Sequence, residues 1–238
     1  MTLLINLQTK WVWNGYWTPR GVVFDVGIAT KKALDKLNDE FVRPDFAGGY
    51  DEYSNGNGSL MRILPLAFYL NGKSFEDRIM SITQVSSITH RHQMSIIACV
   101  IYIEIAIHLI NGLDLKSSIK EMKTAISSYY SGNKEIERFH RILKEDIALY
   151  EAGDIHSSGY VVHTLEASLW SLLTSNSYIE AVLKSINLGE DTDTTGAVTG
   201  GLAGLCYGLQ DVPIEWIDQL ARIGEITALC NRFREVVG

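Results

Sequence analysis

Four glycines at intervals of four residues constrain the fold of this chain more than any other feature: they are Gly196, Gly200, Gly204 and Gly208. Positions four apart lie on one face of an α-helix, so a helix here has one face without side chains. Each glycine costs roughly 1 kcal/mol of helix propensity relative to alanine. We therefore expect a neighbouring backbone to pack closely against this face. A membrane-embedded helix pair is excluded, because the apolar run is too short to span a bilayer and two aspartates precede it.

The rest of the chain also predicts helices, because apolar residues recur at intervals of three and four and no stretch alternates with period two. Ser74 and Ser177 each precede an acidic residue by three positions, the spacing of a helix-capping pair. Residues 1–20 form either a short helix or a surface arm, and Asp25 is placed to cap the helix that comes next. We expect an all-α, single compact multi-helix domain over residues 1–238, with helices at residues 25–37, 60–70, 74–87, 94–110, 115–130, 134–150, 161–173, 177–186 and from 213 onward.

Residues 94–110 are almost entirely apolar, which is typical of a helix at the centre of a helical domain. The segment lies at the short end of the length that spans a membrane and carries Glu104 in its middle, so we interpret it as a core helix. Glu104 and His108 are four residues apart, and we expect them to pair with each other in a structural role. No membrane partner is expected.

Charge and cysteine content exclude further classes of protein. The chain has 21 Lys and Arg against 28 Asp and Glu, a net charge of −7 that argues against nucleic acid as the main partner. Cys99, Cys206 and Cys230 are widely spaced and form no CxxC pair, so we expect neither a disulfide framework nor a zinc site. The first residues lack the pattern of a signal peptide, which predicts a cytoplasmic protein.

A cluster of acidic and hydroxyl side chains, residues 189–194, runs directly into the glycine-bearing helix. Asp191 and Asp193 are one residue apart, with the Thr194 hydroxyl beside them. Two carboxylates and a hydroxyl within one turn are ligands for a hard cation such as Mg²⁺. An aspartate that caps the helix and is stabilised by its dipole explains the pattern equally well. An EF-hand is excluded, because Leu202 stands where that loop requires a bidentate glutamate.

A second loop of small polar residues, Ser-Asn-Gly-Asn-Gly-Ser at 54–59, precedes another predicted helix. Its glycines would let a ligand approach the backbone, and amides at a helix N-terminus bind phosphate. A pair of ordinary Asn-Gly turns is the alternative. His90 stands just before the central helix, where a capping or packed side chain is the alternative to a functional one. These patterns predict a divalent cation and a phosphorylated ligand, but no particular reaction.

Four stretches of the sequence together resemble one known family. They are residues 55–65, the pair Thr89-His90, residues 160–170, and residues 187–196 continuing to Tyr207-Gly208. In this order they are similar to the ADP-ribosylglycohydrolases, an all-helical family of Mg²⁺-dependent hydrolases that remove ADP-ribose from modified proteins. The resemblance implies ADP-ribose or an ADP-ribosylated protein as the partner and assigns no certain catalytic side chain. It implies metal ligands at Asp191, Asp193 and Thr194, a diphosphate and ribose site at Ser54, Gly56, Asn57 and Gly58, and an ADP-ribose contact at His90.

The family pattern includes one feature that this sequence does not contain. Members begin with a helix and a Thr-Asp-Asp motif which, with an upstream glutamate, supplies the other half of a two-Mg²⁺ site. Residues 1–4 resemble the segment that normally comes after that motif, so we expect an N-terminally truncated member that holds one Mg²⁺ or binds metal weakly. Asp45, Asp51 and Glu52 lie near the Asn-Gly loop but do not form the motif.

The sequence therefore supports two functions from different classes. The first is a hydrolase that removes ADP-ribose from modified proteins or related ADP-ribosyl conjugates, by Mg²⁺-assisted cleavage at the anomeric carbon of the ribose. The second is a degenerate, non-catalytic relative that binds ADP-ribose or another nucleotide. A purely structural helical protein is a third interpretation, which the presence of both polar loops disfavours.

Overall fold

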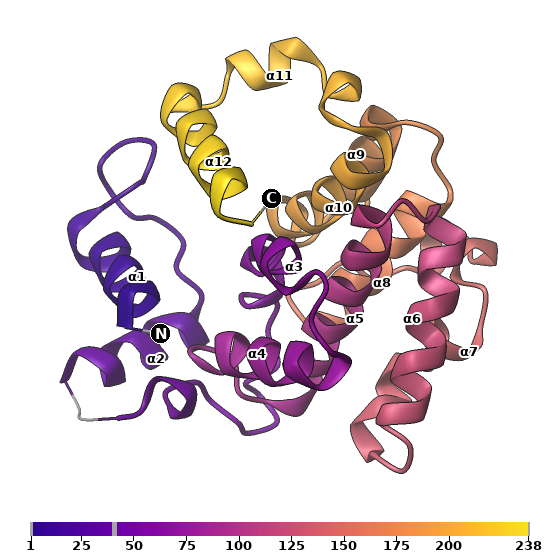
Figure 1. Ribbon diagram of the computed structural model, residues 1–238, viewed down its shortest axis with the longest axis horizontal. Helices are drawn as coiled ribbons and strands as arrows, with labels where there is room; N and C mark the ends of the chain where they lie inside the picture. The colour runs from indigo at the N-terminus through magenta and orange to yellow at the C-terminus, as the bar shows by residue number, and fades with distance from the viewer. Residues whose placement is uncertain (1, 40–41, 238) are drawn as a thin grey trace.

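The computed structural model describes residues 2–39 and 42–237, and every regular element within them is a helix (Figure 1). Two isolated β-bridges join Gly49 to His90 and Gly56 to Tyr160. The chain therefore folds as the single all-α domain that the sequence predicts. Its α-helices are α1 Thr2–Asn14, α2 Ile28–Asp39, α3 Pro65–Leu70, α4 Phe75–Ser87, α5 Gln93–Ile110, α6 Leu115–Tyr129, α7 His140–Lys144, α8 Val161–Leu173, α9 Tyr178–Ile186, α10 Thr192–Tyr207, α11 Ile214–Asp218 and α12 Ile223–Val237.

Helix α5 is the centre of the hydrophobic core. It is long and apolar enough to cross a membrane, yet 83% of its 18 residues are buried inside the protein. Helices α3, α4, α6, α8 and α10 all contact it. A helix that is apolar on every side needs neighbours on every side, which these five helices supply. The interpretation as a core helix is confirmed.

The carboxylate in the middle of α5 pairs with an arginine from the preceding helix. Arg78 of α4 donates from Nε to Glu104 Oε1 at 2.7 Å and from Nη2 to Oε2 at 2.6 Å. The expected pairing of Glu104 with His108 is wrong. Glu104 is fully buried, and a permanently charged, bidentate guanidinium satisfies a buried carboxylate better than an imidazole does.

The glycine face of α10 packs against α9, as the sequence predicts. A Cβ added at Gly196 would lie 3.0 Å from Ile186 Cγ2, and one at Gly200 would lie 3.1 Å from Tyr178 Oη. Gly204 has open space beside it, and Gly208 ends the helix with φ of 79°. Two of the four glycines therefore account for the close approach of α9. This packing fixes the direction in which α10 presents its first turn.

Two predicted helices differ from the structure in their bounds. Residues 134–150 form a 3₁₀ segment at Lys134–Phe139, the short helix α7 and a 3₁₀ turn at Ile147–Leu149. The Asp146 side chain accepts from the backbone N–H of Ala148 and so starts a new turn, which interrupts the helix. Asp25 lies three residues before α2 begins and has φ of 52°, so it is not the N-cap of that helix.

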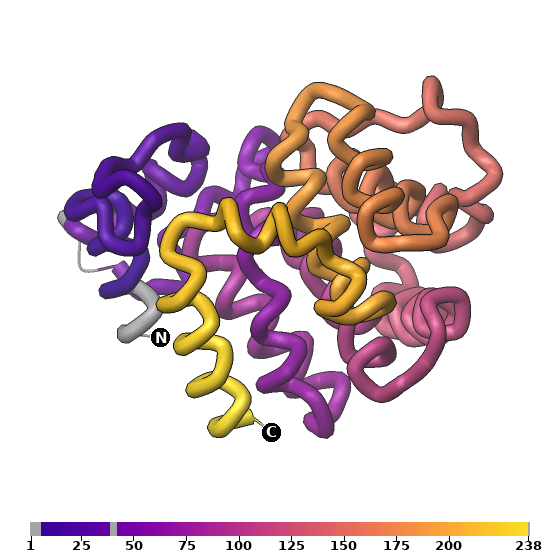
Figure 2. Tube along the Cα trace, turned by 90° about the horizontal axis from the view of Figure 1, so that it is seen from above, coloured from indigo at the N-terminus to yellow at the C-terminus, as the bar shows by residue number. Residues whose placement is uncertain are grey.

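Helix α12 and the residue that precedes it contact two other parts of the chain. Helix α12 runs beside α3, where Phe68 and Phe233 meet edge to face with ring centroids 6.2 Å apart (Figures 1 and 2). Arg222, just before α12, lies over the ring of Trp17 at 5.0 Å. Helix α12 therefore links the segment after α1 to the remainder of the helical domain.

Candidate functional site

Asn57 joins the two polar loops that the sequence singles out, which we call the glycine loop (residues 54–59) and the acidic loop (residues 189–194). Its side-chain nitrogen donates to Asp191 Oδ2 and to Thr164 Oγ1 of α8, both at 2.8 Å. Asn57 is buried, and its backbone N–H donates to the carbonyl of Gly159 at 3.1 Å. The amide is therefore held in place, and it brings together segments 134 residues apart in the sequence.

Residues 157–161 run between the two loops and bind both of them. The backbone N–H of Asp191 donates to the carbonyl of Ser157, whose hydroxyl donates in turn to the carbonyl of Gly189. On the other side, the N–H of Val161 donates to the carbonyl of Asn55. A Cβ at Gly159 would lie 3.2 Å from Asp191 Oδ2, so glycine leaves room for that carboxylate. The two loops thus form one site because this segment bridges them.

The acidic loop presents its carboxylates at the first turn of α10. Asp191 stands at the N-cap position, but its side chain makes no capping hydrogen bond and turns to Asn57 instead. Partial burial raises the pKa of Asp191, yet hydrogen bonds from Asn57 and Thr194 and the contact with Asp193 outweigh burial and hold the pKa below its ordinary value. Asp193 is exposed and accepts from the backbone N–H of Thr194, whose side chain is buried. The closest hydrogen bond of the Asp191 carboxylate therefore comes from Asn57 and not from the end of its own helix.

These three residues offer limited coordination to a metal. Asp191, Asp193 and Thr194 supply two carboxylates and one hydroxyl, and Asp191 Oδ2 already accepts a hydrogen bond. Within residues 2–39 and 42–237, no group of three His, Cys, Asp or Glu side chains is placed to hold a metal ion. Two carboxylates and a hydroxyl are, with water, the kinds of ligand that a hard cation such as Mg²⁺ takes.

His90 lies against the glycines of the glycine loop. A Cβ at Gly58 would come within 2.7 Å of His90 Cε1, and one at Gly56 within 3.5 Å of Nε2. Thr89 Oγ1 lies 2.8 Å from His90 Nδ1. Burial, followed by the charge of Arg62, lowers the pKa of His90 to about 3, so the ring is neutral at physiological pH. The structure thus brings His90, Gly56, Gly58 and Asn57 to one place.

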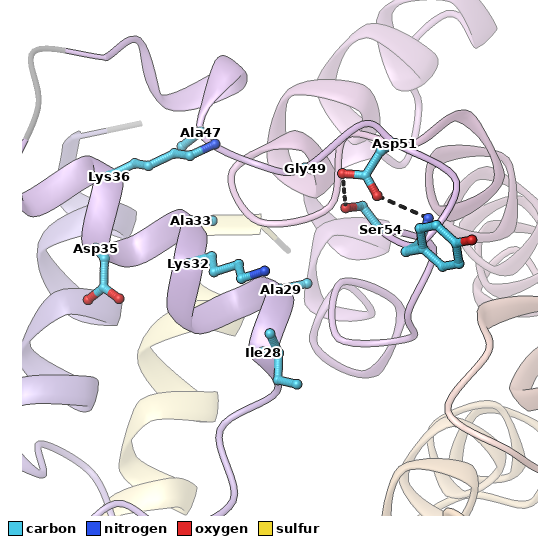
Figure 3. A pocket seen from close by; sticks show the side chains of 11 residues that line it. Ile28, Ala29, Lys32, Ala33, Asp35, Lys36, Ala47, Gly49, Asp51 and Ser54 are labelled. Atoms are coloured by element: carbon cyan, nitrogen blue, oxygen red, sulfur yellow. Dashed lines mark hydrogen bonds between the residues drawn. The ribbon is translucent and has the colours of Figure 1, made fainter.

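Ser54 lies on the other side of the glycine loop, in a pocket of about 510 Å³ between α2 and residues 47–54 (Figure 3). Its hydroxyl donates to Asp51 Oδ2 at 3.0 Å, and this bond is the main reason that the pKa of Asp51 lies below its ordinary value. Lys32 and Lys36 of α2 also line the pocket. Among the hydrogen bonds of the described chain, none joins Ser54 to His90 or Asn57. Ser54 lines this pocket together with Gly49, whose backbone pairs with that of His90.

Several residues that build the site carried no sequence signal of their own. Thr164 stands within a stretch of the family pattern, but the contact of its hydroxyl with Asn57 depends on how α8 is placed. His163 accepts or donates at Nδ1 with the Ser158 hydroxyl, 2.8 Å away, and its ring lies 5.0 Å from that of His156. Burial, followed by the neighbouring His156, lowers the pKa of His163. These two histidines flank the segment that bridges the loops.

Comparisons with known proteins agree with this arrangement. A family model described as ADP-ribosylglycohydrolase matches residues 4–238. ADP-ribosylarginine hydrolase Tri1 of Pseudomonas putida (strain GB-1) is 32% identical over 225 residues, which cover 91% of this chain and 55% of that protein. The ADP-ribosyl-[dinitrogen reductase] glycohydrolase of Rhodospirillum rubrum is 30% identical over 196 residues, 82% of this chain and 60% of that protein.

A solved structure, described as an ADP-ribosylglycohydrolase-related protein complex, has the same fold. It matches with a TM-score of 0.74 at 26% identity, covering 89% of this chain and 70% of that one. The chain spans less than two thirds of the length of the two curated relatives.

Proposed function

Because the chain belongs to the ADP-ribosylglycohydrolase family, we propose that it hydrolyses the bond between ADP-ribose and a modified protein or a related ADP-ribosyl conjugate. The observation that carries this proposal is the Asn57 junction, which places a glycine-rich loop beside the carboxylates of the acidic loop. The relatives described above act on ADP-ribosylarginine and on ADP-ribosyl-dinitrogen reductase, by their names. An ADP-ribosylated arginine is therefore the first substrate to test.

In this proposal the glycine loop binds the ligand. Gly56 and Gly58 have no side chains, which leaves room for the His90 ring against the loop where we place the diphosphate and the ribose. Asn57 holds the Asp191 carboxylate toward the ligand through its hydrogen bond. Asp191, Asp193 and Thr194 would hold one Mg²⁺. A bound Mg²⁺ supplies Lewis-acid polarisation and orients the reacting ribose.

The alternative is a relative that binds ADP-ribose without cleaving it. The observation that favours this alternative is the small set of metal donors: among the described residues, no group of three His, Cys, Asp or Glu side chains is placed to hold a metal ion. Both proposals need the glycine loop to bind ADP-ribose, but only the first needs the acidic loop to bind metal. Metal dependence therefore separates them.

The test is calorimetric titration of the purified chain with ADP-ribose, once with Mg²⁺ and once with EDTA, together with a hydrolysis assay on ADP-ribosylarginine. We expect Mg²⁺-dependent binding and release of ADP-ribose. Asp191→Asn should weaken Mg²⁺-dependent binding by about tenfold or more, because one of the two carboxylates loses its charge. Glu190→Gln is the matched control, since it removes an exposed charge from the same loop without touching the donor set.

Each outcome decides between the proposals. Binding with hydrolysis in Mg²⁺ supports the hydrolase. Binding that is unchanged by EDTA, without hydrolysis, supports the non-catalytic relative. No binding of ADP-ribose in either buffer refutes both.

A further inference from the structure

Arg62 is a cation close to the site without an acidic partner. It comes after the glycine loop in the 3₁₀ turn Leu60–Arg62, and none of the ion pairs in the described chain includes it. Its guanidinium donates from Nη1 to the carbonyl of Gly58 and from Nη2 to Thr89 Oγ1 at 2.6 Å. Burial lowers the pKa of Arg62 to about 10, so the group stays charged at neutral pH. Arg62 is half-buried, and a charge partly removed from water is costly; two hydrogen bonds to uncharged oxygens offset that cost here.

The hydrogen bonds of Thr89 determine where its hydroxyl proton lies. A guanidinium has donors and no acceptor, so Thr89 Oγ1 must accept from Arg62. Thr89 Oγ1 could accept a second hydrogen bond as well, but among the contacts of the described residues only His90 Nδ1, 2.8 Å away, can accept its hydroxyl proton. A nitrogen that accepts this proton carries none itself. The one proton of the neutral imidazole ring is therefore on Nε2.

The Nε2 atom faces the backbone of the glycine loop. An added Cβ would lie 3.2 Å from it at Gly58 and 3.5 Å from it at Gly56, so any side chain there would crowd the ring. Within residues 2–39 and 42–237, no hydrogen bond to Nε2 is formed. The backbone of His90 is held by Ser86, because the N–H of His90 donates to the carbonyl of Ser86 at 2.8 Å and the carbonyl of His90 accepts from the Ser86 hydroxyl at 2.9 Å, while Thr89 Oγ1 holds the ring at Nδ1. A held donor without a protein acceptor is left for a ligand.

We propose that Arg62 is a positioning residue: through the Thr89 hydroxyl it fixes His90 in its Nε2–H form, so that the ring presents one hydrogen-bond donor to an oxygen atom of the ligand bound at the glycine loop. The identity of that ligand, an ADP-ribosyl group, rests on the proposed function. Which ring nitrogen of His90 carries the proton does not rest on the proposed function, because it depends on the contacts of the chain alone. The proposed function and the proposed state of the His90 ring can therefore be refuted separately.

The first test is nuclear magnetic resonance of the full chain with ¹⁵N-labelled histidine. The ¹⁵N chemical shifts of the two ring nitrogens show directly which one carries the proton, and His90→Gln assigns the His90 signals among the six histidines. We expect Nδ1 without a proton and Nε2 with one from pH 5 to pH 8. Protonated Nδ1 in the unmodified chain would overturn the proposal without any variant.

Variants then test whether Arg62 is responsible. Arg62→Met removes the cation that donates to Thr89 Oγ1, so a hydrogen bond from Nδ1–H to that oxygen is no longer disfavoured, and we expect a mixture of the two forms of His90. Thr89→Val should have the same effect, whereas Arg62→Lys and Thr89→Ser keep the donors and should restore the Nε2–H form. Arg91→Met is the matched control, because Arg91 is next to His90 but stacks on Phe46 and Tyr50 instead of contacting Thr89. A single Nε2–H form in folded Arg62→Met and Thr89→Val would overturn the proposal.

The second test is the affinity for ADP-ribose. A His90 ring without a proton on Nε2 cannot donate to the ligand, so one hydrogen bond is lost. We therefore expect ADP-ribose to bind about tenfold more weakly to Arg62→Met and Thr89→Val, and with about the original affinity to Arg62→Lys. Unchanged affinity in a variant whose ring form has changed would show that His90 donates to nothing, which contradicts the proposal. If the unmodified chain does not bind ADP-ribose, the proposed function fails while the ring measurement still stands.

Discussion

Replacing Asn57 with alanine tests whether this one side chain assembles the site. The substitution removes two hydrogen bonds of 2.8 Å, one to the Thr164 hydroxyl and one to the Asp191 carboxylate. A neutral bond contributes about 1 kcal/mol, and a bond to a charged acceptor contributes about 1.5–3 kcal/mol. Because Asp191 is half-buried, water replaces part of the second bond, so the lower value applies. The expected loss is about 2.5 kcal/mol in the free energy of unfolding.

Urea titration and thermal unfolding measure this loss, and a domain of this length should show a Tm lower by about 5–10 °C. Asn55→Ala is the matched control, since Asn55 is two positions away and its amide donates to the carbonyl of Glu52 at the surface. The control should lose less than about 1 kcal/mol. The substitution Asp191→Ala and the double variant complete a cycle in which we expect about 1.5 kcal/mol of coupling between Asn57 and Asp191. Equal losses in the two asparagine variants, or a coupling near zero, would refute the idea that Asn57 joins the loops.

The packing and the charges lead to three further predictions. Gly204→Ala should stabilise the chain by about 0.5–1 kcal/mol, because its Cβ meets open space. Gly201→Ala should destabilise it by about 1–3 kcal/mol, because its Cβ would lie 2.5 Å from Tyr102 Oη. Urea titration measures both variants, and equal effects on the free energy of unfolding would contradict the packing of α10. Arg78→Met should lower the free energy of unfolding by about 3–5 kcal/mol, because it leaves buried Glu104 without its partner, and His108→Ala should lower it much less. A larger loss in His108→Ala would show that Glu104 pairs with the histidine. His90 has a lower pKa in the folded chain than the ordinary 6.5, so its contribution to the free energy of unfolding is complete above pH 6.5 and is lost as the pH falls toward 3. The loss at pH 5 is about 2 kcal/mol. Thermal unfolding should show this loss in the unmodified chain and not in His90→Gln.

The sequence predicted the helices wherever local rules decide them. Ser74 and Ser177 cap α4 and α9 as their spacing indicates, because a capping hydrogen bond joins residues only three positions apart. The close face of α10 was also predictable, since four glycines in register favour the close approach of a neighbouring helix. The break at residue 145 was missed: the bond between the Asp146 side chain and the N–H of Ala148 is local, but residues 134–150 keep a helical periodicity through it.

The candidate site shows the same division. Asp191, Asp193 and Thr194 are adjacent in the sequence, so their common location was certain, and their role as metal ligands stays a prediction. That Asn57 contacts Asp191 depends on how α8 and α10 pack around α5, and that Ser54 lines the pocket beside α2 depends on where α2 lies. Glu104 shows the limit most clearly: its partner at the helical spacing of four was His108, and its partner in space is Arg78. Spacing can identify a neighbour on the same helix but cannot identify a partner on another.

The Asn57 junction also has a consequence for the order in which the chain folds. Its two side-chain bonds span 107 and 134 residues, so they close very long loops of chain. Closing such loops costs chain entropy, and contacts of this range form late unless the elements between them are already in place. An intermediate with α4, α5 and α6 packed could hold much of the core and still have no binding site. Recovery of ligand binding after dilution from urea would then lag behind recovery of helical structure. Ligand binding would therefore measure the last step of folding.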